Sequence, residues 1–212
     1  MSIVVELWNN DLATPEYIEE ISGRIQGLKF STKLPGGFTT CSFALKADLP
    51  EAWEWLVERT FQRIVIKDGK KILWEGRIED NGLEAGRATV VAYGYYASLT
   101  DEPFYAAFND DVDVVVKAVL TANCPEIDNT DHTHIAAVAT AVVNTEADAD
   151  LTPQALIEKL IAFSNTDSRI WDFAIWENRL AWLVERNVSA LDWKVYLSDF
   201  NRFKLKRRGG SM

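Results

Sequence analysis

The sequence predicts an α+β fold: a small antiparallel β-barrel, then a mixed α/β domain, then the opening strands of a further β-sheet at the C-terminus. Three observations lead to this prediction. Residues 63–96 have the pattern of strands joined by tight turns, residues 111–124 and 152–164 carry apolar side chains at helical spacing, and residues 193–205 return to strand-like runs. The predicted domain limits are 1–104 for the barrel, 105–191 for an acidic α+β domain, and 192–212 for an incomplete second barrel with a basic tail.

The first domain opens with three predicted strands at 3–8, 24–30 and 38–45, separated by turn-forming clusters. A short helix is then expected over Pro50–Arg59, because proline suits the first helical turn. Its apolar residues Trp53, Leu56 and Val57 follow at helical spacing. We expect this helix to plug one end of the barrel.

The meander contains the clearest turn signal of the chain. Asp68-Gly69 separates two β-prone runs, and this dipeptide favours a type I′ hairpin turn, which needs positive φ at both central residues. A second reversal is predicted from Asn81-Gly82 to Ala85-Gly86, before the run that ends at Tyr95. With 48% apolar residues in 212, the chain can bury a sizeable core around these strands.

The second domain shows helical periodicity. A helix is predicted from Asp111 until Pro125 stops it, and Thr152-Pro153 supplies the N-cap and first position of another. The stretch Ile135–Val143 between them reads as irregular structure or a weak strand. A hairpin with strands at 170–176 and 180–184 is expected next. The last two strand-like runs are Trp193–Leu197 and Phe200–Leu205.

Charge is concentrated in the middle of the chain. Residues 101–170 hold 13 acidic and 3 basic side chains, which equals the whole net charge of −10. Phosphate binding needs clustered Lys and Arg, so we expect no specific nucleic-acid recognition. Four basic residues close to the C-terminus are more typical of a solvated end: Lys204, Lys206, Arg207 and Arg208. No apolar run is long enough to span a bilayer, and no signal peptide is recognisable. We therefore expect the chain to be synthesised in the cytoplasm and not to insert into a membrane.

Residues that can carry chemistry are few. Cys41 and Cys124 are far apart and are predicted to be buried, reduced thiols. Both histidines lie in one short segment with two aspartates, which are candidate metal ligands: Asp128, Asp131, His132 and His134. Their spacing matches no compact zinc signature, so a polar surface loop is the preferred interpretation, and whether His132 or His134 binds a metal stays open.

Catalytic alternatives have little support. The acid pairs Glu51/Glu54 and Glu79/Asp80 are sequence neighbours, whereas glycoside hydrolysis needs two carboxyl groups facing each other across a cleft. No phosphate-binding glycine loop is present in the sequence. We therefore predict no catalytic, cofactor-binding or metal residues, no cofactor and no enzymatic activity.

The chain has eight tryptophans, which raises the alternative of a carbohydrate-binding module. Most of them fall inside predicted strands or on a helix face, where packing in a core or subunit interface is the more frequent role. An exposed groove lined by several tryptophans would distinguish the carbohydrate-binding alternative.

Two stretches resemble a known family. The strands IVIKDGKKILWEGRIED and ATVVAYGYYASLTDEPF are similar to the first domain of phage tail baseplate hub proteins. The Thr-Pro helix, WDFAIWENRLAWLVER and DWKVYLSD are similar to the domain that follows it in the same family. Together the matches cover roughly residues 24–104 and 150–200.

The resemblance implies a structural protein of the virion at the tail tip. Such hubs are homotrimers in which each subunit contributes two similar barrels, so that six barrels continue the tail tube. The implied partners are further copies of the chain, the distal tail protein, the tail tube protein, the tape measure protein and the central spike or fibre. This chain departs from the pattern, because only the opening strands of a second barrel are recognisable.

Overall fold

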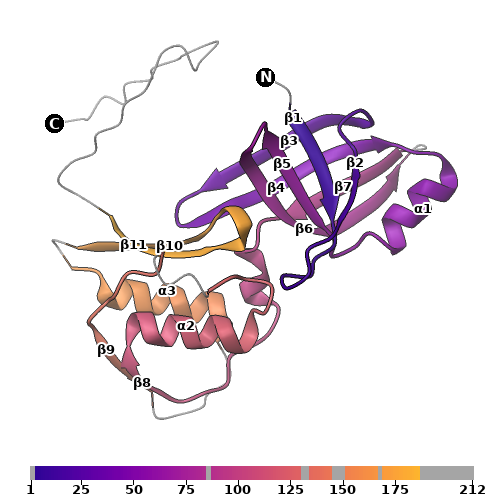
Figure 1. Ribbon diagram of the computed structural model, residues 1–212. Helices are drawn as coiled ribbons and strands as arrows, with labels where there is room; N and C mark the ends of the chain where they lie inside the picture. The colour runs from indigo at the N-terminus through magenta and orange to yellow at the C-terminus, as the bar shows by residue number, and fades with distance from the viewer. Residues whose placement is uncertain (1–2, 85–86, 130–133, 145–150, 167–168, 187–212) are drawn as a thin grey trace, which may run out of the picture.

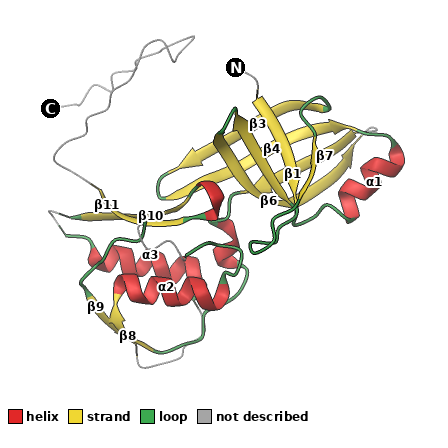
Figure 2. Cartoon of the chain, viewed as in Figure 1, coloured by secondary structure: helices red, strands yellow, loops and turns green. Residues whose placement is uncertain are grey.

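The computed structural model describes residues 3–84, 87–129, 134–144, 151–166 and 169–186 (Figures 1 and 2). In this part of the chain, three α-helices accompany a large mixed sheet and a small two-stranded one, in agreement with the predicted α+β class. The strands are β1 (Ile3–Trp8), β2 (Tyr17–Glu20), β3 (Ile25–Lys33), β4 (Gly36–Lys46), β5 (Arg63–Asp68), β6 (Lys71–Glu84), β7 (Arg87–Tyr93), β8 (Phe108–Asp111), β9 (Ala141–Asn144), β10 (Ile170–Ile175) and β11 (Ala181–Arg186). The helices are α1 (Leu49–Val57), α2 (Val112–Asn123) and α3 (Pro153–Ser164).

The large sheet has nine strands in the order β11-β10-β4-β7-β6-β5-β1-β2, with β3 also on β4. No backbone ladder joins β2 to β3 within the described residues, so the prediction of a closed barrel is wrong. The turn between these strands explains the opening. The Ile21 N–H donates to the Val5 carbonyl at 2.9 Å, and the Ser22 hydroxyl accepts from the Val5 N–H at 2.8 Å. The chain is thereby held against β1, and β3 begins beside the end of β4 instead.

The predicted hairpin at Asp68-Gly69 is confirmed, but its predicted type I′ turn is wrong. Asp68 pairs with Lys71, so the turn residues are Gly69 and Lys70, and Lys70 does not have positive φ. β5 and β6 pair from Arg63 to Asp68, and Gly69 has φ of +60°.

The second predicted reversal is confirmed between Glu84 and Arg87, which pair at the ends of β6 and β7. Its predicted start at Asn81-Gly82 is wrong, because both residues lie within β6 and pair with β7. The Asn81 side-chain amide donates to the Trp55 carbonyl at 2.6 Å, a long-range bond that replaces local turn formation. Ala85-Gly86 lies outside the described residues.

Replacing Gly69 with valine should destabilise the protein by about 1–2 kcal/mol, since a β-branched residue would be forced into the left-handed region. A Cβ added at Gly69 would meet no atom within 4 Å, so the cost comes from the backbone alone. Urea unfolding followed by circular dichroism measures it. Gly69→Asn is the matched control and should lose much less, because asparagine tolerates positive φ. Equal stability of the valine variant and the natural protein would contradict the assignment.

Helix α1 forms where predicted, and Asp48 caps it by accepting the Glu51 N–H at 3.0 Å. The apolar face differs from the prediction. Ala52 and Trp55 are its buried residues, whereas Trp53 and Val57 are exposed. Sequence spacing alone could not tell the two faces apart, because both carry apolar side chains.

The second half of the chain packs α2 and α3 against β10 and the two-stranded sheet of β8 and β9 (Figure 1). α2 begins after Asp111 and ends at Asn123, shortly before Pro125 as predicted. α3 begins at Pro153, with the Thr152 hydroxyl accepting the Ala155 N–H at 3.3 Å. The weak strand expected within Ile135–Val143 corresponds in its last residues to β9.

Two apolar clusters form the cores. One fills the sheet of the N-terminal half around Trp55 and Trp74, and the other lies among α2, α3 and β10 around Val116 and Phe173. The predicted hairpin of β10 and β11 is confirmed, and β10 joins the large sheet by parallel pairing with Gly36 and Gly37 of β4. The predicted strands at 193–197 and 200–205 lie outside the described residues.

Both thiols are buried and free, as predicted for Cys41 and Cys124. Burial raises the pKa of each thiol to about 12. Burial also raises the pKa of the Tyr95 hydroxyl. These groups keep their protons in the folded chain at pH values where the unfolded chain releases them.

Stability should therefore fall as the pH rises from about 9 toward 12, because the unfolded state binds fewer protons in that window. Urea unfolding midpoints at pH 7, 8, 9 and 10 test this dependence. Cys41→Ala should show a shallower decline than the natural protein, since one of the titrating groups is gone. An unchanged midpoint across the series would contradict the burial of these groups.

Candidate functional site

The four candidate metal ligands do not form a site among the described residues. Asp131 and His132 lie outside them. Asp128 and His134 are used structurally: their carbonyls accept the N–H groups of Ala181 and Leu183, at 3.1 and 2.9 Å. The His134 ring lies 4.2 Å from that of Trp182. No group of three potential ligands is present in the described part of the chain, and no helix there is long and apolar enough to cross a membrane.

Three acids of the two pairs, Glu51, Glu54 and Glu79, form ion pairs. Glu51 and Glu54 pair with Arg24 and Arg59. Glu79 pairs with Arg77 at 2.8 Å. Each of these carboxylates thus faces a guanidinium, which is not the arrangement of two acids across a cleft that glycoside hydrolysis requires.

A buried ionic network connects the two halves of the molecule, and the sequence prediction missed it. Its centre is Glu75 of β6, which is fully buried, pairs with Arg63 and accepts the Arg179 N–H at 2.6 Å. Asn178 and Arg179, in the turn before β11, both have φ of +60°. Glu75 and Arg77 have opposite charges and are two residues apart, so they lie on one face of a strand. This pattern is the signal in the sequence that could have indicated the network.

Arg179 is itself almost fully buried. Its guanidinium donates to the carbonyls of Asn10 at 2.9 Å and Asp11 at 3.4 Å, and lies 5.1 Å from the centre of the Tyr95 ring. Burial lowers the pKa of Arg179 below its ordinary value. These contacts tie the turn before β11 to the loop between β1 and β2.

Arg77 makes the second set of contacts in the network. It pairs with Glu79, with Asp101 at 2.7 Å, and with Glu126. Burial disfavours the charge on Arg77, but Glu126 and the neighbouring carboxylates outweigh it, so the pKa of Arg77 is raised. Asn10 also donates to Glu126 at 2.6 Å. Segments far apart in sequence are therefore fixed around one strand, and the arrangement stabilises a structure instead of exposing a reactive group.

The free edges of the large sheet are the surfaces best suited to contacts with other chains. β2 and β3 form these edges, while the far edge of β11 is bonded to Asp128 and to residues 134–136. Each residue of β3 is exposed or half-buried. Lys29 and Lys33 of β3 have no ion pair within the described ranges, and Glu20 of β2 likewise has none. An unpaired edge offers backbone N–H and C=O groups to a neighbouring strand.

The fold is similar to that of a prophage tail protein. The 43 kDa tail protein of prophage MuSo2 from Shewanella oneidensis superposes with a TM-score of 0.50 and 13% sequence identity, covering 87% of this chain and 54% of that one. A tail protein from Neisseria meningitidis MC58 superposes with a TM-score of 0.48 and 12% identity, over 85% of this chain and 50% of that one. The chain thus spans about half the length of these proteins. No protein-family model and no curated protein sequence matches it.

Proposed function

We propose that the chain is a structural, non-enzymatic component of a phage tail tip: a baseplate hub protein that continues the tail tube and connects it to distal tail proteins and the central spike or fibre. The observation that carries this proposal is the shared fold with the MuSo2 tail protein over 87% of the chain. Low identity limits that observation to the fold, so the role is argued from the surfaces.

Two features of the molecule support an assembly role. The free edges of β2 and β3 are suited to pairing with strands of neighbouring chains. The buried charges of β6 are engaged in a network around Glu75 that joins the two halves, instead of forming a reactive site. The proposed partners are further copies in a homotrimer, the distal tail protein, the tail tube protein, the tape measure protein and the spike or fibre.

Cryo-electron microscopy of tailed particles that contain an affinity-labelled version of the chain tests this proposal. The label should appear at the tail tip, between the tube and the distal fibre. Purified particles that lack the chain, or carry it on the capsid, would overturn the proposed role. The matched control is the same label on a capsid protein.

The carbohydrate-binding alternative requires several tryptophans along an exposed groove. Among the tryptophans that the structure describes, Trp53 alone is largely exposed, and Trp55, Trp74 and Trp171 are buried. A single tryptophan on a helix is not a stacking surface, so the described tryptophans give this alternative no support.

A further inference from the structure

The outer face of α1 is apolar and exposed. Leu49, Trp53 and Val57 follow each other at intervals of four residues, and their exposed fractions are 70%, 61% and 56%. We call these three residues the α1 ridge. Because α1 buries Ala52 and Trp55 against the sheet, the ridge is a second apolar face. Apolar residues at this helical spacing are the anchors used when a helix docks into a hydrophobic groove of a partner.

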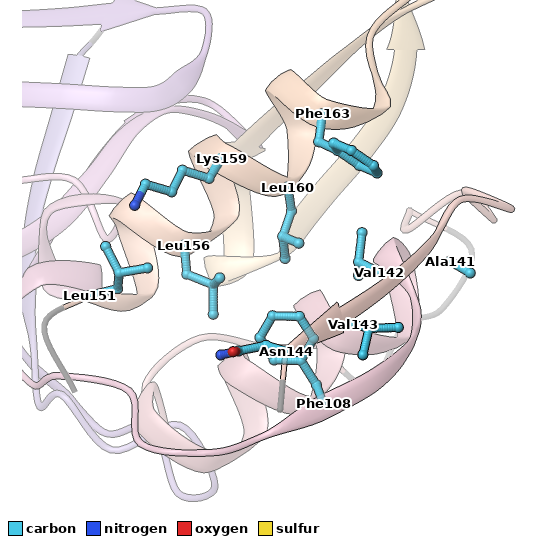
Figure 3. A pocket seen from close by; sticks show the side chains of 10 residues that line it. All are labelled: Phe108, Ala141, Val142, Val143, Asn144, Leu151, Leu156, Lys159, Leu160 and Phe163. Atoms are coloured by element: carbon cyan, nitrogen blue, oxygen red, sulfur yellow. The ribbon is translucent and has the colours of Figure 1, made fainter. Parts of the chain in front are cut away.

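The same chain carries an apolar groove, with a volume of about 670 Å³, between β9 and α3 (Figure 3). We call it the β9–α3 groove. Figure 3 shows Leu156 and Leu160 of α3 pointing toward β9. Phe108 of β8 lies beside its strand partner Asn144, across the groove from α3. Its apolar lining includes Phe108, Val142, Val143, Leu156, Leu160 and Phe163. Val143 and Phe163 are 63% and 66% exposed, so the groove presents apolar surface to an incoming partner.

One pair of opposite charges flanks the ridge and the groove, and the second half of the chain is acidic overall. Glu58, the C-cap of α1, is exposed and has no ion pair within the described residues. Lys159 of α3 lines the groove and likewise has no carboxylate partner in the ranges that the structure describes. Opposite free charges beside two apolar surfaces favour one orientation of docking.

α1 lies at one end of the molecule and β9 at the other (Figure 1). We propose that the α1 ridge of one copy occupies the β9–α3 groove of a second copy, with Glu58 facing Lys159. A contact between two different surfaces is head-to-tail, and it generates a ring or a filament instead of a two-fold dimer. The inference rests on the proposed assembly role, for which it specifies a contact between copies.

Two single variants separate the surfaces. Trp53→Asp removes the ridge and Phe163→Asp blocks the groove, and both side chains are exposed, so the fold should be kept. Analytical ultracentrifugation of the full chain should show concentration-dependent association for the natural protein. Each variant alone should associate on the order of 30-fold more weakly or worse, as for loss of an interface hot spot.

Mixing the two variants is the decisive measurement. The Phe163→Asp copy keeps a ridge and the Trp53→Asp copy keeps a groove, so the mixture should form dimers that cannot grow further. The double variant Trp53→Asp/Phe163→Asp lacks both surfaces. Mixing it with either single variant should therefore not restore association. Monomers in the mixture, or a natural protein that is monomeric at all concentrations, would overturn the contact.

A charge exchange tests the orientation. Glu58→Lys and Lys159→Glu should each weaken association, and combining the two substitutions in one chain should restore it, because the pair is re-formed with reversed signs. Glu185→Lys, an exposed residue of β11, is the matched control and should have no effect. Failure of rescue would reject the Glu58–Lys159 pairing. The hub role would survive all of these failures, because particle imaging tests it separately.

Discussion

Replacing Glu75 with glutamine is expected to cost about 3–5 kcal/mol of stability, the largest loss we predict for a single side chain. The carboxylate is fully buried, pairs with Arg63 and accepts the Arg179 N–H at 2.6 Å. Glutamine keeps the size but removes the charge, so buried guanidinium groups lose their counter-charge. Urea unfolding monitored by tryptophan fluorescence measures the difference.

The matched control is Glu185→Gln. Glu185 pairs with Arg169 at 3.7 Å, and both side chains are exposed. An exposed pair contributes about 1 kcal/mol or less, so this variant should unfold almost like the natural protein. If both variants lost the same free energy of unfolding, Glu75 would not be the residue that stabilises the buried network.

Replacing Gly37 with alanine is expected to cost at least about 2 kcal/mol and to loosen the junction of β4 with β10. Gly37 has φ of +92°, a conformation that alanine adopts only under strain. A Cβ there would also overlap the Ile175 carbonyl oxygen. The effect should concentrate in the junction, because Gly37 pairs directly with Ile175.

Hydrogen exchange followed by mass spectrometry locates this effect. Peptides that contain β10 and β11 should exchange faster in the variant than in the natural protein. Gly23→Ala is the matched control, since a Cβ there meets nothing within 4 Å and its φ is not positive. Unchanged protection of β10 in Gly37→Ala would contradict the role given to this contact.

Local signals in the sequence predicted local structure well. Asp68-Gly69 and Thr152-Pro153 act through backbone preferences of the residues themselves, so the hairpin and the helix start were predictable. Asn81-Gly82 has similar turn chemistry but lies in β6, since pairing with β7 and the bond to Trp55 outweigh it. The buried face of α1 was missed because the sheet decides which apolar face is covered.

The buried network could not be predicted from local pattern. Glu75 and Arg179 are 104 residues apart, and their contact exists only once β10 and β11 join the sheet. Closure of the predicted barrel failed for a similar reason. The turn after β2 is hydrogen-bonded to Val5 through Ile21 and Ser22, and this determines where β3 begins. The spacing of residues in the sequence does not predict these hydrogen bonds.

β4 has a mechanical consequence through its position in the sheet. It carries β3 and β7 along its length and β10 at Gly36 and Gly37, so one strand belongs to the framework of both halves. Pulling the halves apart would load the short parallel ladder to β10 in shear, together with the ion pairs around Arg77. We expect this strand to be the path along which tension passes through the molecule.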